Sequence, residues 1–253
     1  MMALDFEYGD EGQFAPTLGL VVLQTDEVIE REFREITKTT NCSLFHSRVP
    51  SDPTVTSETL AQMALDIPAS VELLPSTLGF DVIGYACTSG ATVIGEEKVA
   101  ELIRSVRPGV ATSNPLSAVK AALSTLNIRR LGFVTPYVAE VSLAMRAALE
   151  EDGFEISGFG SFEQSEEHLV ARISAKSILD AIINIGESTE CEAVFVACTN
   201  LRTFDILATA ERQIGKPVIS STQALAWHML RLAGSSASPD HLGELFERDL
   251  VDG

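Results

Sequence analysis

Two cysteines lie in matching sequence surroundings that favour proton-transfer chemistry. Cys87 lies in Ala86-Cys-Thr-Ser-Gly90, and Cys198 lies in Ala197-Cys-Thr-Asn-Leu201. An apolar run precedes each cysteine, and small polar residues that can cap a helix follow it. Because a helix N-terminus stabilises a thiolate, we expect the pKa of both thiols to fall from about 8.5 toward neutrality. Two such thiols facing one ligand could share a proton, one acting as base and the other as acid.

A cysteine more often serves as a small apolar core residue than as a catalyst. We assign that structural role to Cys42 and Cys191, because neither closes an apolar run in a repeated motif. A redox disulfide between Cys87 and Cys198 would lack the usual C-x-x-C context, and the four cysteines match no zinc-site spacing. The chemical role is therefore assigned to the Cys87 and Cys198 pair.

Short apolar runs alternate with stretches of helical periodicity over most of the chain, which is the βαβ pattern of a parallel sheet. The first helical stretch runs from Asp26 to Ile36. The expected strands share an almost wholly apolar composition, typical of strands covered on both faces, and they span residues 18–23, 80–85, 131–134 and 193–197. Ligands of such sheets bind beyond the carboxyl ends of the strands, where both cysteine motifs are expected.

Three segments of the first half recur in the same order in the second half, at an offset of roughly 110 residues, about the size of one domain. Leu18-Gly-Leu-Val-Val resembles Leu131-Gly-Phe-Val-Thr, the two cysteine motifs match, and Pro108-Gly-Val-Ala-Thr-Ser resembles Pro217-Val-Ile-Ser-Ser-Thr. Shared βαβ chemistry is the alternative explanation of these matches. We infer an α/β fold with two subdomains that have parallel sheets and are related by a pseudo-twofold axis, which brings the thiols to opposite sides of one cleft.

The predicted domains are residues 17–115 and residues 116–234, each with one of the two cysteine motifs. The remaining ends of the chain, residues 1–16 and 235–253, are polar or acidic. We expect both ends to form peripheral arms.

The composition is that of a soluble globular protein with an acidic surface. The 253 residues include 36 Asp and Glu against 18 Lys and Arg, which gives a formal net charge of −18. This charge repels phosphate backbones and anionic lipid headgroups, so we expect neither nucleic acid nor a membrane as a partner. The first residues are acidic where a secretory signal needs basic and apolar residues, and no apolar run is long enough to span a membrane. We expect a cytoplasmic location.

The cysteine motifs carry a family resemblance. Gly84-Tyr-Ala-Cys-Thr-Ser-Gly90 and Phe195-Val-Ala-Cys-Thr-Asn200, with Val134-Thr-Pro-Tyr137 opening the second half, resemble the aspartate/glutamate racemase superfamily. Within it, the chain is most similar to the branch of maleate cis-trans isomerase, arylmalonate decarboxylase and the racemase-like proteins of ectoine utilisation. The similarity runs from Thr17 to Gly234, and the segment from Gln223 onward is closest to the ectoine-utilisation group.

This resemblance implies cofactor-independent chemistry at the carbon next to a carboxylate. Racemases of this kind remove the α-proton with one cysteine and return a proton to the opposite face with the other, whereas in maleate isomerase the first cysteine adds to the double bond. Carried over by position, Cys87 and Cys198 are the catalytic residues. The hydroxyls of Thr88, Ser89 and Thr199, together with backbone N–H groups, are expected to cradle the carboxylate and the enolate.

Two further residues follow from the same resemblance. Tyr137 is expected to donate to a substrate carboxylate, and Asn200, which closes the second motif, is expected to contact the substrate. The decarboxylase branch keeps only the second cysteine, so the presence of Cys87 makes a decarboxylase the poorer match.

One departure from the family pattern concerns the substrate. Where maleate isomerases and many racemases have an asparagine after the first strand, this chain has Asp26. An aspartate there would repel a second carboxylate or bind an amine, which favours an amino-acid-like substrate over maleate. The alternative is a helix N-cap, since aspartate is a preferred capping residue. Arg48 is a weaker candidate for a bidentate carboxylate clamp, and an ordinary surface arginine is its alternative.

We expect neither a cofactor nor a metal ion. Gly84 and Gly90 do not form a G-x-G-x-x-G fingerprint, which excludes the usual dinucleotide site. The histidines are too scattered along the chain for a metal site: His46, His168, His228 and His241.

These inferences lead to one function and its rivals. The chain is expected to be an isomerase, a two-cysteine racemase or epimerase of a small amino-acid-like or dicarboxylate substrate, such as an acylated diamino acid of the ectoine pathway. Maleate-type cis-trans isomerisation and arylmalonate-type decarboxylation are the enzymatic alternatives. A metabolite-binding module without turnover is the alternative of another class. The sequence leaves the number of subunits open, a homo-oligomer included.

Overall fold

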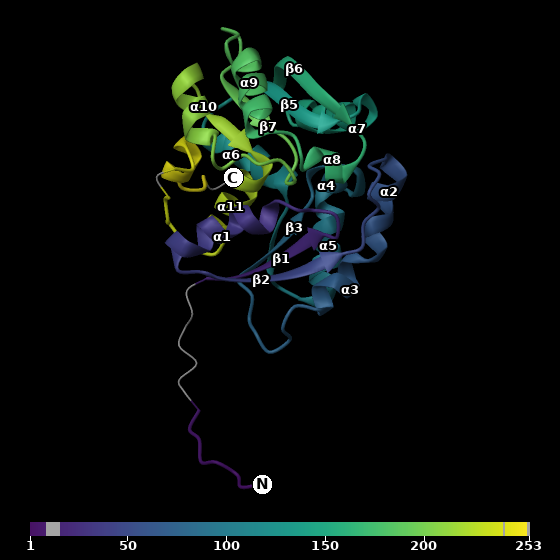
Figure 1. The fold of residues 1–253 in the computed structure, drawn as a ribbon, viewed down its shortest axis with the longest axis vertical. Coiled ribbons are helices and arrows are strands. Elements are labelled where there is room, and N and C mark those ends of the chain that lie inside the picture. The colour runs from purple at the N-terminus through teal and green to yellow at the C-terminus, as the bar shows by residue number, and fades with distance from the viewer. Residues whose placement is uncertain (9–15, 240, 252–253) are drawn as a thin grey trace.

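The computed structural model describes residues 1–8, 16–239 and 241–251, and it contains two parallel sheets of four strands each (Figure 1). The first sheet has the order β2-β1-β3-β4, and the second has the order β6-β5-β7-β8. The strands of the first sheet are β1 (Thr17–Leu23), β2 (Ser43–Val49), β3 (Val82–Ala86) and β4 (Ala111–Ser113). Those of the second are β5 (Arg130–Tyr137), β6 (Glu155–Gln164), β7 (Ala193–Val196) and β8 (Val218–Ser220).

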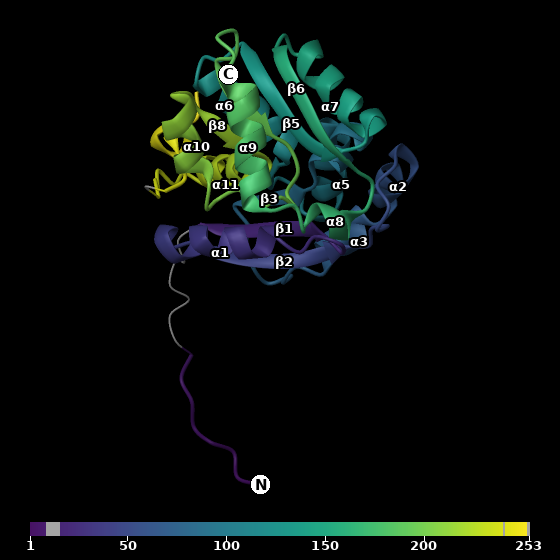
Figure 2. The same cartoon turned by 45° about the horizontal axis from the view of Figure 1, so that its top comes forward.

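Helices connect successive strands and pack on the sheets (Figure 2). In the first half they are α1 (Ile29–Thr40), α2 (Ser57–Gln62), the 3₁₀-helix η1 (Met63–Leu65), α3 (Ile67–Glu72), α4 (Thr88–Ile94), α5 (Glu96–Val106) and α6 (Pro115–Thr125). In the second half they are α7 (Ala139–Glu151), α8 (Glu167–Val170), α9 (Ala175–Gly186), α10 (Leu207–Ile214), α11 (Ser221–Leu232) and the 3₁₀-helix η2 (Glu244–Glu247). No helix within the described part of the chain is long and apolar enough to cross a membrane.

The strands expected from the sequence are confirmed, with small shifts of their ends. β1, β3 and β7 are buried along almost their whole length, as expected for strands inside a covered parallel sheet. The first helix begins at Ile29 rather than Asp26, because residues 24–28 form a turn and a bend after β1.

The two halves have the same topology, which confirms the predicted pair of subdomains related by a pseudo-twofold axis. All three sequence matches fall on equivalent places: the starts of β1 and β5, the ends of β3 and β7, and the approaches to β4 and β8. The equivalent helices α6 and α11 pack against each other, and α11 also packs on β3 and β4. The last helix therefore joins the second half to the first sheet. The division of the chain at residue 115 stays a prediction.

The two chain ends differ in how they relate to the body of the molecule. Residues 1–8 are exposed and extend away from it (Figure 1), and most of the remaining N-terminal arm lies outside the described residues. Near the other end, Leu242 and Phe246 are buried. The Arg231 guanidinium of α11 donates to the carbonyl oxygens of Phe246 (2.8 Å) and Arg248 (3.0 Å). The C-terminal segment expected as a peripheral arm is thus packed onto the last helix.

A buried carboxylate joins α1 of the first half to the loop after β7. Glu32 is 6% exposed, and its Oε1 atom accepts the backbone N–H groups of Thr203 (2.6 Å) and Phe204 (2.9 Å). Burial raises the pKa of Glu32 to about 7, although these backbone donors oppose the rise. Ionising Glu32 therefore costs more free energy in the folded chain than in the unfolded one.

We expect Glu32→Gln to flatten the pH dependence of stability. The pKa of Glu32 is higher in the folded chain than in the unfolded chain, so the folded state favours the protonated side chain. The contribution of Glu32 to the free energy of unfolding is therefore fully present below about pH 4.5 and is lost as the pH rises through about 7. The amide can still accept the two N–H groups but does not ionise. Between about pH 5 and about pH 8, the free energy of unfolding should fall by roughly 3 kcal/mol less in the variant.

Urea denaturation at a series of pH values measures this difference. Glu35→Gln is the control on the same helix, because the pKa of the exposed Glu35 is lowered by its hydrogen bond with Lys38 and its titration lies below this pH range. Equal slopes for Glu32→Gln and the parent protein would contradict the assignment.

Candidate active site

Cys87 directly follows β3, as the sequence predicts, and is itself the N-cap residue of α4, a role that was expected of the polar residues after it. Its Sγ atom accepts the Gly90 backbone N–H at 3.1 Å and lies 3.5 Å from the Ser89 hydroxyl. The residue is 2% exposed. The thiol thus lies in a buried pocket of small polar groups at the carboxyl end of a central strand.

Cys198 occupies the equivalent place after β7 but has a different backbone. Its φ angle is +100°, a conformation that costs a non-glycine residue of order 1–3 kcal/mol. The expected helix does not begin here, since residues 199–201 form a turn and α10 starts at Leu207. The Asn200 N–H donates to Sγ at 3.2 Å, and the Ser221 hydroxyl accepts the Cys198 N–H at 3.0 Å. These contacts hold the strained residue in place.

Hydrogen bonds connect the two cysteine motifs across the halves. The Ser221 Oγ atom, which accepts the Cys198 N–H, also accepts the Thr88 hydroxyl at 2.8 Å. The Thr199 hydroxyl lies 2.9 Å from Asp26 Oδ2 and 3.2 Å from the Ala86 carbonyl oxygen. The residues after β3 and after β7 therefore form one buried site.

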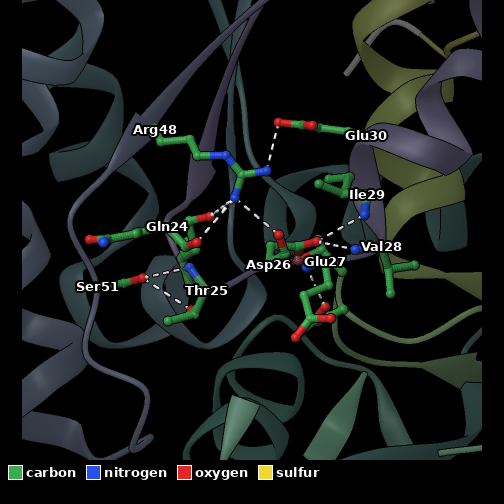
Figure 3. Close-up of polar contacts among 12 residues, drawn as sticks. Gln24, Thr25, Asp26, Glu27, Val28, Ile29, Glu30, Arg48 and Ser51 are labelled. Carbon is green, nitrogen blue, oxygen red and sulfur yellow. Dashed lines mark hydrogen bonds and ion pairs between the residues drawn. The ribbon is translucent and has the colours of Figure 1, made fainter. Parts of the chain in front are cut away.

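Asp26 is not the N-cap of α1, which is Val28, but its side chain binds the backbone at the start of this helix and also reaches the second motif. Its Oδ1 atom accepts the N–H groups of Val28 (2.8 Å) and Ile29 (2.9 Å) at the start of α1 (Figure 3). Its Oδ2 atom accepts the Thr199 hydroxyl. Burial raises the pKa of Asp26, and the backbone donors oppose this rise.

Arg48 does not reach the thiols. One of its guanidinium nitrogens donates to the carbonyl oxygens of Leu23 (2.9 Å) and Asp26 (3.0 Å), and the other forms a 2.8 Å ion pair with Glu30 (Figure 3). The side chain is 40% exposed. Arg48 therefore stabilises the turn after β1 from the surface of the protein.

Glu167 is a residue of this site that sequence analysis missed. It opens α8, is 3% exposed, and accepts the Tyr137 hydroxyl at 3.3 Å and the Asn200 amide at 2.9 Å. The Tyr137 hydroxyl also lies 2.9 Å from Cys198 Sγ. In the sequence, Glu167 sits in a run of charged residues that resembles an exposed surface, so no local pattern indicated it.

The electrostatic surroundings contradict the expected lowering of the thiol pKa values. Burial raises the pKa of Cys87 to about 12, despite the Ser89 and Gly90 hydrogen bonds. Burial and then the charge of Glu167 raise the pKa of Cys198 well above its usual range. The short helix after Cys87 and the turn after Cys198 do not compensate for the loss of water. Loss of a thiol proton to water is therefore disfavoured at both cysteines in this conformation.

The remaining cysteines and the histidines lie outside this network of hydrogen bonds. Cys191 is buried and donates to the Ala193 carbonyl, while the half-buried Cys42 contacts Thr40. His228 Nδ1 lies 2.9 Å from the Ser113 hydroxyl, and burial lowers its pKa to about 4. Within residues 1–8, 16–239 and 241–251, no group of three or more His, Cys, Asp and Glu side chains could hold a metal ion.

A surface cleft lies beside the buried site. It has a volume of about 520 Å³ and is lined by residues that include Gln24, Ser51, Thr59 and Met63. A small cavity that reaches Glu167 shares Ser51, Thr59 and Met63 with this cleft. The cleft therefore lies next to the small cavity that borders Glu167.

Two parallel α/β halves, each with a cysteine after its third strand, define a protein of the aspartate/glutamate racemase type. The sequence model of the arylmalonate decarboxylase family matches residues 68–246, and the chain belongs to this family. It is 27% identical to the maleate isomerase of Nocardia farcinica over 92% of this chain and 96% of that protein. It is 28% identical to the arylmalonate decarboxylase of Bordetella bronchiseptica over 71% of each chain.

Solved structures agree with these relatives. A mutant of Nocardia farcinica maleate cis-trans isomerase with a covalently bound succinylcysteine intermediate superposes with a TM-score of 0.83 at 25% identity, covering 92% of this chain and 98% of that one. The comparisons confirm the predicted branch of the superfamily and the predicted fold. They also agree with the predicted enzyme class, because several relatives are isomerases.

We expect Ser221→Ala to loosen the connection between the two cysteine motifs. The substitution leaves the buried Cys198 N–H and the Thr88 hydroxyl without their acceptor, which should lower the free energy of unfolding by about 1–3 kcal/mol. Denaturant unfolding of Ser221→Ala and of Ser105→Ala, an exposed serine on α5, measures the effect. If Ser221→Ala lowers the free energy of unfolding no more than Ser105→Ala does, the two hydrogen bonds to Ser221 do not stabilise the fold.

Proposed function

We propose that this protein is a racemase or epimerase that uses Cys87 and Cys198 to exchange the proton on the carbon next to a carboxylate. The observation that carries the proposal is the pairing of two buried thiols, each at the carboxyl end of an equivalent strand, through hydrogen bonds between their motifs. A pseudo-twofold arrangement suits a reaction that must treat both faces of one carbon. One thiol removes the α-proton, and the other returns a proton to the opposite face.

The polar groups around the thiols suit the intermediate of such a reaction. Thr88, Ser89 and Thr199 are all buried and provide hydroxyls beside the cysteines. The backbone N–H groups of Gly90 and Asn200 are 3.1 Å and 3.2 Å from the sulfur atoms, so these donors are already oriented toward negative charge. Preorganised donors of this kind stabilise the thiolate that a cysteine becomes before it takes a proton from the substrate.

The charges of the site favour a substrate that carries an ammonium group. Asp26 and Glu167 are both buried beside the second cysteine motif. Among the described residues, neither carboxylate has an ion pair with a lysine or arginine, and the contact of Arg48 with Asp26 is to the backbone carbonyl rather than to the carboxylate. A dianion would add two negative charges without a cation to pair them. An amino-acid-like substrate supplies that cation, and an acylated diamino acid of ectoine utilisation fits this class.

Maleate-type cis-trans isomerisation is the second candidate. It is supported by the maleate isomerases among the relatives and by the covalent succinylcysteine in one of them. In that reaction a cysteine of this chain would act as nucleophile toward a double bond rather than as a base. Both candidates use a small carboxylate in the cytoplasm, and they differ in the charge that the site must accept.

Incubation in D₂O with single enantiomers of N-acetyldiaminobutyrate, aspartate and glutamate, and with maleate, tests the proposal. We expect deuterium at the α-carbon and appearance of the opposite enantiomer for an amino-acid substrate, followed by NMR and chiral chromatography. Cys87→Ser and Cys198→Ser should each lower racemisation by about 10²–10⁴ or more, because serine is a far weaker acid.

Cys42→Ser is the matched control, since this cysteine lies outside the site, and it should keep the parental rate. Parental racemisation by either active-site serine variant would exclude the opposed-thiol mechanism. Conversion of maleate alone would favour the second candidate, and binding without any turnover would favour a metabolite-binding module.

We expect Asp26→Asn to change the substrate preference. The Oδ1 atom of an asparagine can accept the Val28 and Ile29 N–H groups as the aspartate does, so the fold should persist while one negative charge is lost. The ratio of kcat/KM for an amino-acid substrate to that for maleate should fall, because the ammonium loses a partner and the dianion loses a repulsion. Unchanged kinetics on both substrates would leave Asp26 only its structural role.

A further inference from the structure

Glu167 is a buried carboxylate whose hydrogen-bond partners are all neutral. Its Oε1 atom accepts the Tyr137 hydroxyl, and its Oε2 atom accepts the Asn200 amide. A buried carboxylate is costly unless it is paired with a cation or takes up a proton. Within the described chain, Glu167 has no ion pair with a lysine or arginine, so in the absence of substrate the uptake of a proton is the available way to remove its charge.

The hydrogen bonds from Glu167 lead in one direction to Cys198. A tyrosine hydroxyl has a single proton to donate. If that proton points at Glu167, the 2.9 Å contact between Tyr137 and Cys198 must be donated by the thiol. The three side chains then form a continuous path for a proton from Cys198 Sγ to Glu167 Oε1.

Cys87 has no equivalent path. Its sulfur contacts the Gly90 N–H, the Ser89 hydroxyl and the Tyr85 hydroxyl. The other contact of the Tyr85 hydroxyl is the Met63 sulfur at 3.6 Å, so within the described chain none of these groups leads to a carboxylate. The two thiols therefore occupy equivalent places in the fold but have unequal access to a proton acceptor.

We propose that Glu167 accepts the proton of Cys198 through Tyr137 and so makes Cys198 the thiolate of the pair. The S–H bond of Cys198 breaks, its proton passes to the tyrosine oxygen, and the tyrosine proton passes to Glu167 Oε1. Tyr137 remains neutral throughout. Glu167 acts through Tyr137 rather than on the substrate, so it is a positioning residue. The use of this thiolate as a base toward the α-carbon rests on the proposed function.

The path keeps the number of negative charges in the buried site constant. Burial, together with the charges of Glu167 and Asp26, raises the pKa of Cys198, so loss of the proton to water would create a third anion among them. Transfer to Glu167 moves a charge instead of adding one. The Asn200 N–H, 3.2 Å from Sγ, then donates to the thiolate.

The protons balance over a full turnover. The Cys198 thiolate takes the substrate proton, and Cys87 gives its own proton to the other face. The site then holds a Cys87 thiolate and a protonated Glu167. After the product leaves, the Glu167 proton returns through solvent to Cys87, and the starting state is restored.

The groups that face Glu167 favour titration near neutral pH. Burial raises its pKa to about 7, the charge of Asp26 adds to the rise, and the Asn200 and Tyr137 hydrogen bonds oppose it. Cys198 after β7 and Cys87 after β3 are the thiols within range of its charge. Glu167 is therefore ionised above about pH 7 and able to accept a proton there.

NMR of protein labelled with ¹³C at the cysteine Cβ tests the path without any substrate, because the Cβ shift distinguishes thiol from thiolate. In the parent protein, we expect the Cys198 thiolate to appear in two steps, a partial one near pH 7 as the pair loses its first proton and a second at alkaline pH. In Glu167→Gln the first step should vanish, and the alkaline step should move to lower pH because a neighbouring charge is gone.

Glu32→Gln is the matched control, since it removes another buried carboxylate whose pKa is also raised to about 7 but which contacts backbone N–H groups. It should keep both steps. Tyr137→Phe keeps Glu167 but removes the hydroxyl that connects it to Cys198, so the first titration step should also vanish in this variant. It tests the proposal even if Glu167→Gln does not fold. Persistence of the first step in a folded Glu167→Gln or Tyr137→Phe protein would overturn the proposal.

Turnover gives a second readout. With an amino-acid substrate found in the D₂O experiment, kcat/KM of the parent protein should rise as the pH increases through about 7. In Glu167→Gln this rise should be absent, and the rate at neutral pH should be about 10²-fold lower. An unchanged rise in Glu167→Gln would also overturn the proposal. If the NMR steps behave as expected but no substrate is racemised, the proposed function fails while the proton path stands.

Discussion

The ends of strands from two halves are buried against each other, and every polar group there must find its partner inside the protein. The loop after β7 meets this demand by bonding to the first half: Thr199 to Asp26, Asn200 to the Glu27 backbone N–H, and Thr203 to Glu32. These bonds hold Cys198 in its strained backbone conformation. The geometry of the second thiol thus depends on α1, an element far away in the sequence.

The same exclusion of water explains the behaviour of the acids. Burial is the largest cause of the raised pKa of Asp26, Glu32 and Glu167. Backbone N–H groups compensate Asp26 and Glu32, and both therefore serve well as connectors between elements. Among the residues that the structure describes, Glu167 receives two side-chain donors and no backbone donor to its carboxylate. A buried acid that is held by side-chain donors alone is better suited to proton transfer than to structural support.

The sequence was sufficient to predict the fold and the two thiols because these depend on local patterns. Apolar runs predicted the central strands, and the repeated Ala-Cys-Thr motif identified the residues after β3 and β7. The match around Pro217 also indicated the region of Ser221, although not its hydrogen bonds to both motifs. Glu167 and the raised thiol pKa values could not be predicted, because both depend on which distant segments exclude water from the site.

Equivalent positions in a repeated fold need not have equivalent chemistry. The pseudo-twofold axis relates Cys87 to Cys198, and a tyrosine hydroxyl lies beside each thiol, yet among the described residues only the tyrosine beside Cys198 also contacts a carboxylate. A symmetric pair of buried thiols would share its proton equally and give neither face of the substrate a ready base. Glu167 makes the two thiols unequal, because a carboxylate connected to Cys198 alone makes Cys198 the charged thiol before the substrate binds. Two enantiomers have equal free energies, so the enzyme cannot change their ratio at equilibrium. The difference between the two thiols therefore affects the rate at which this equilibrium is reached and not its position.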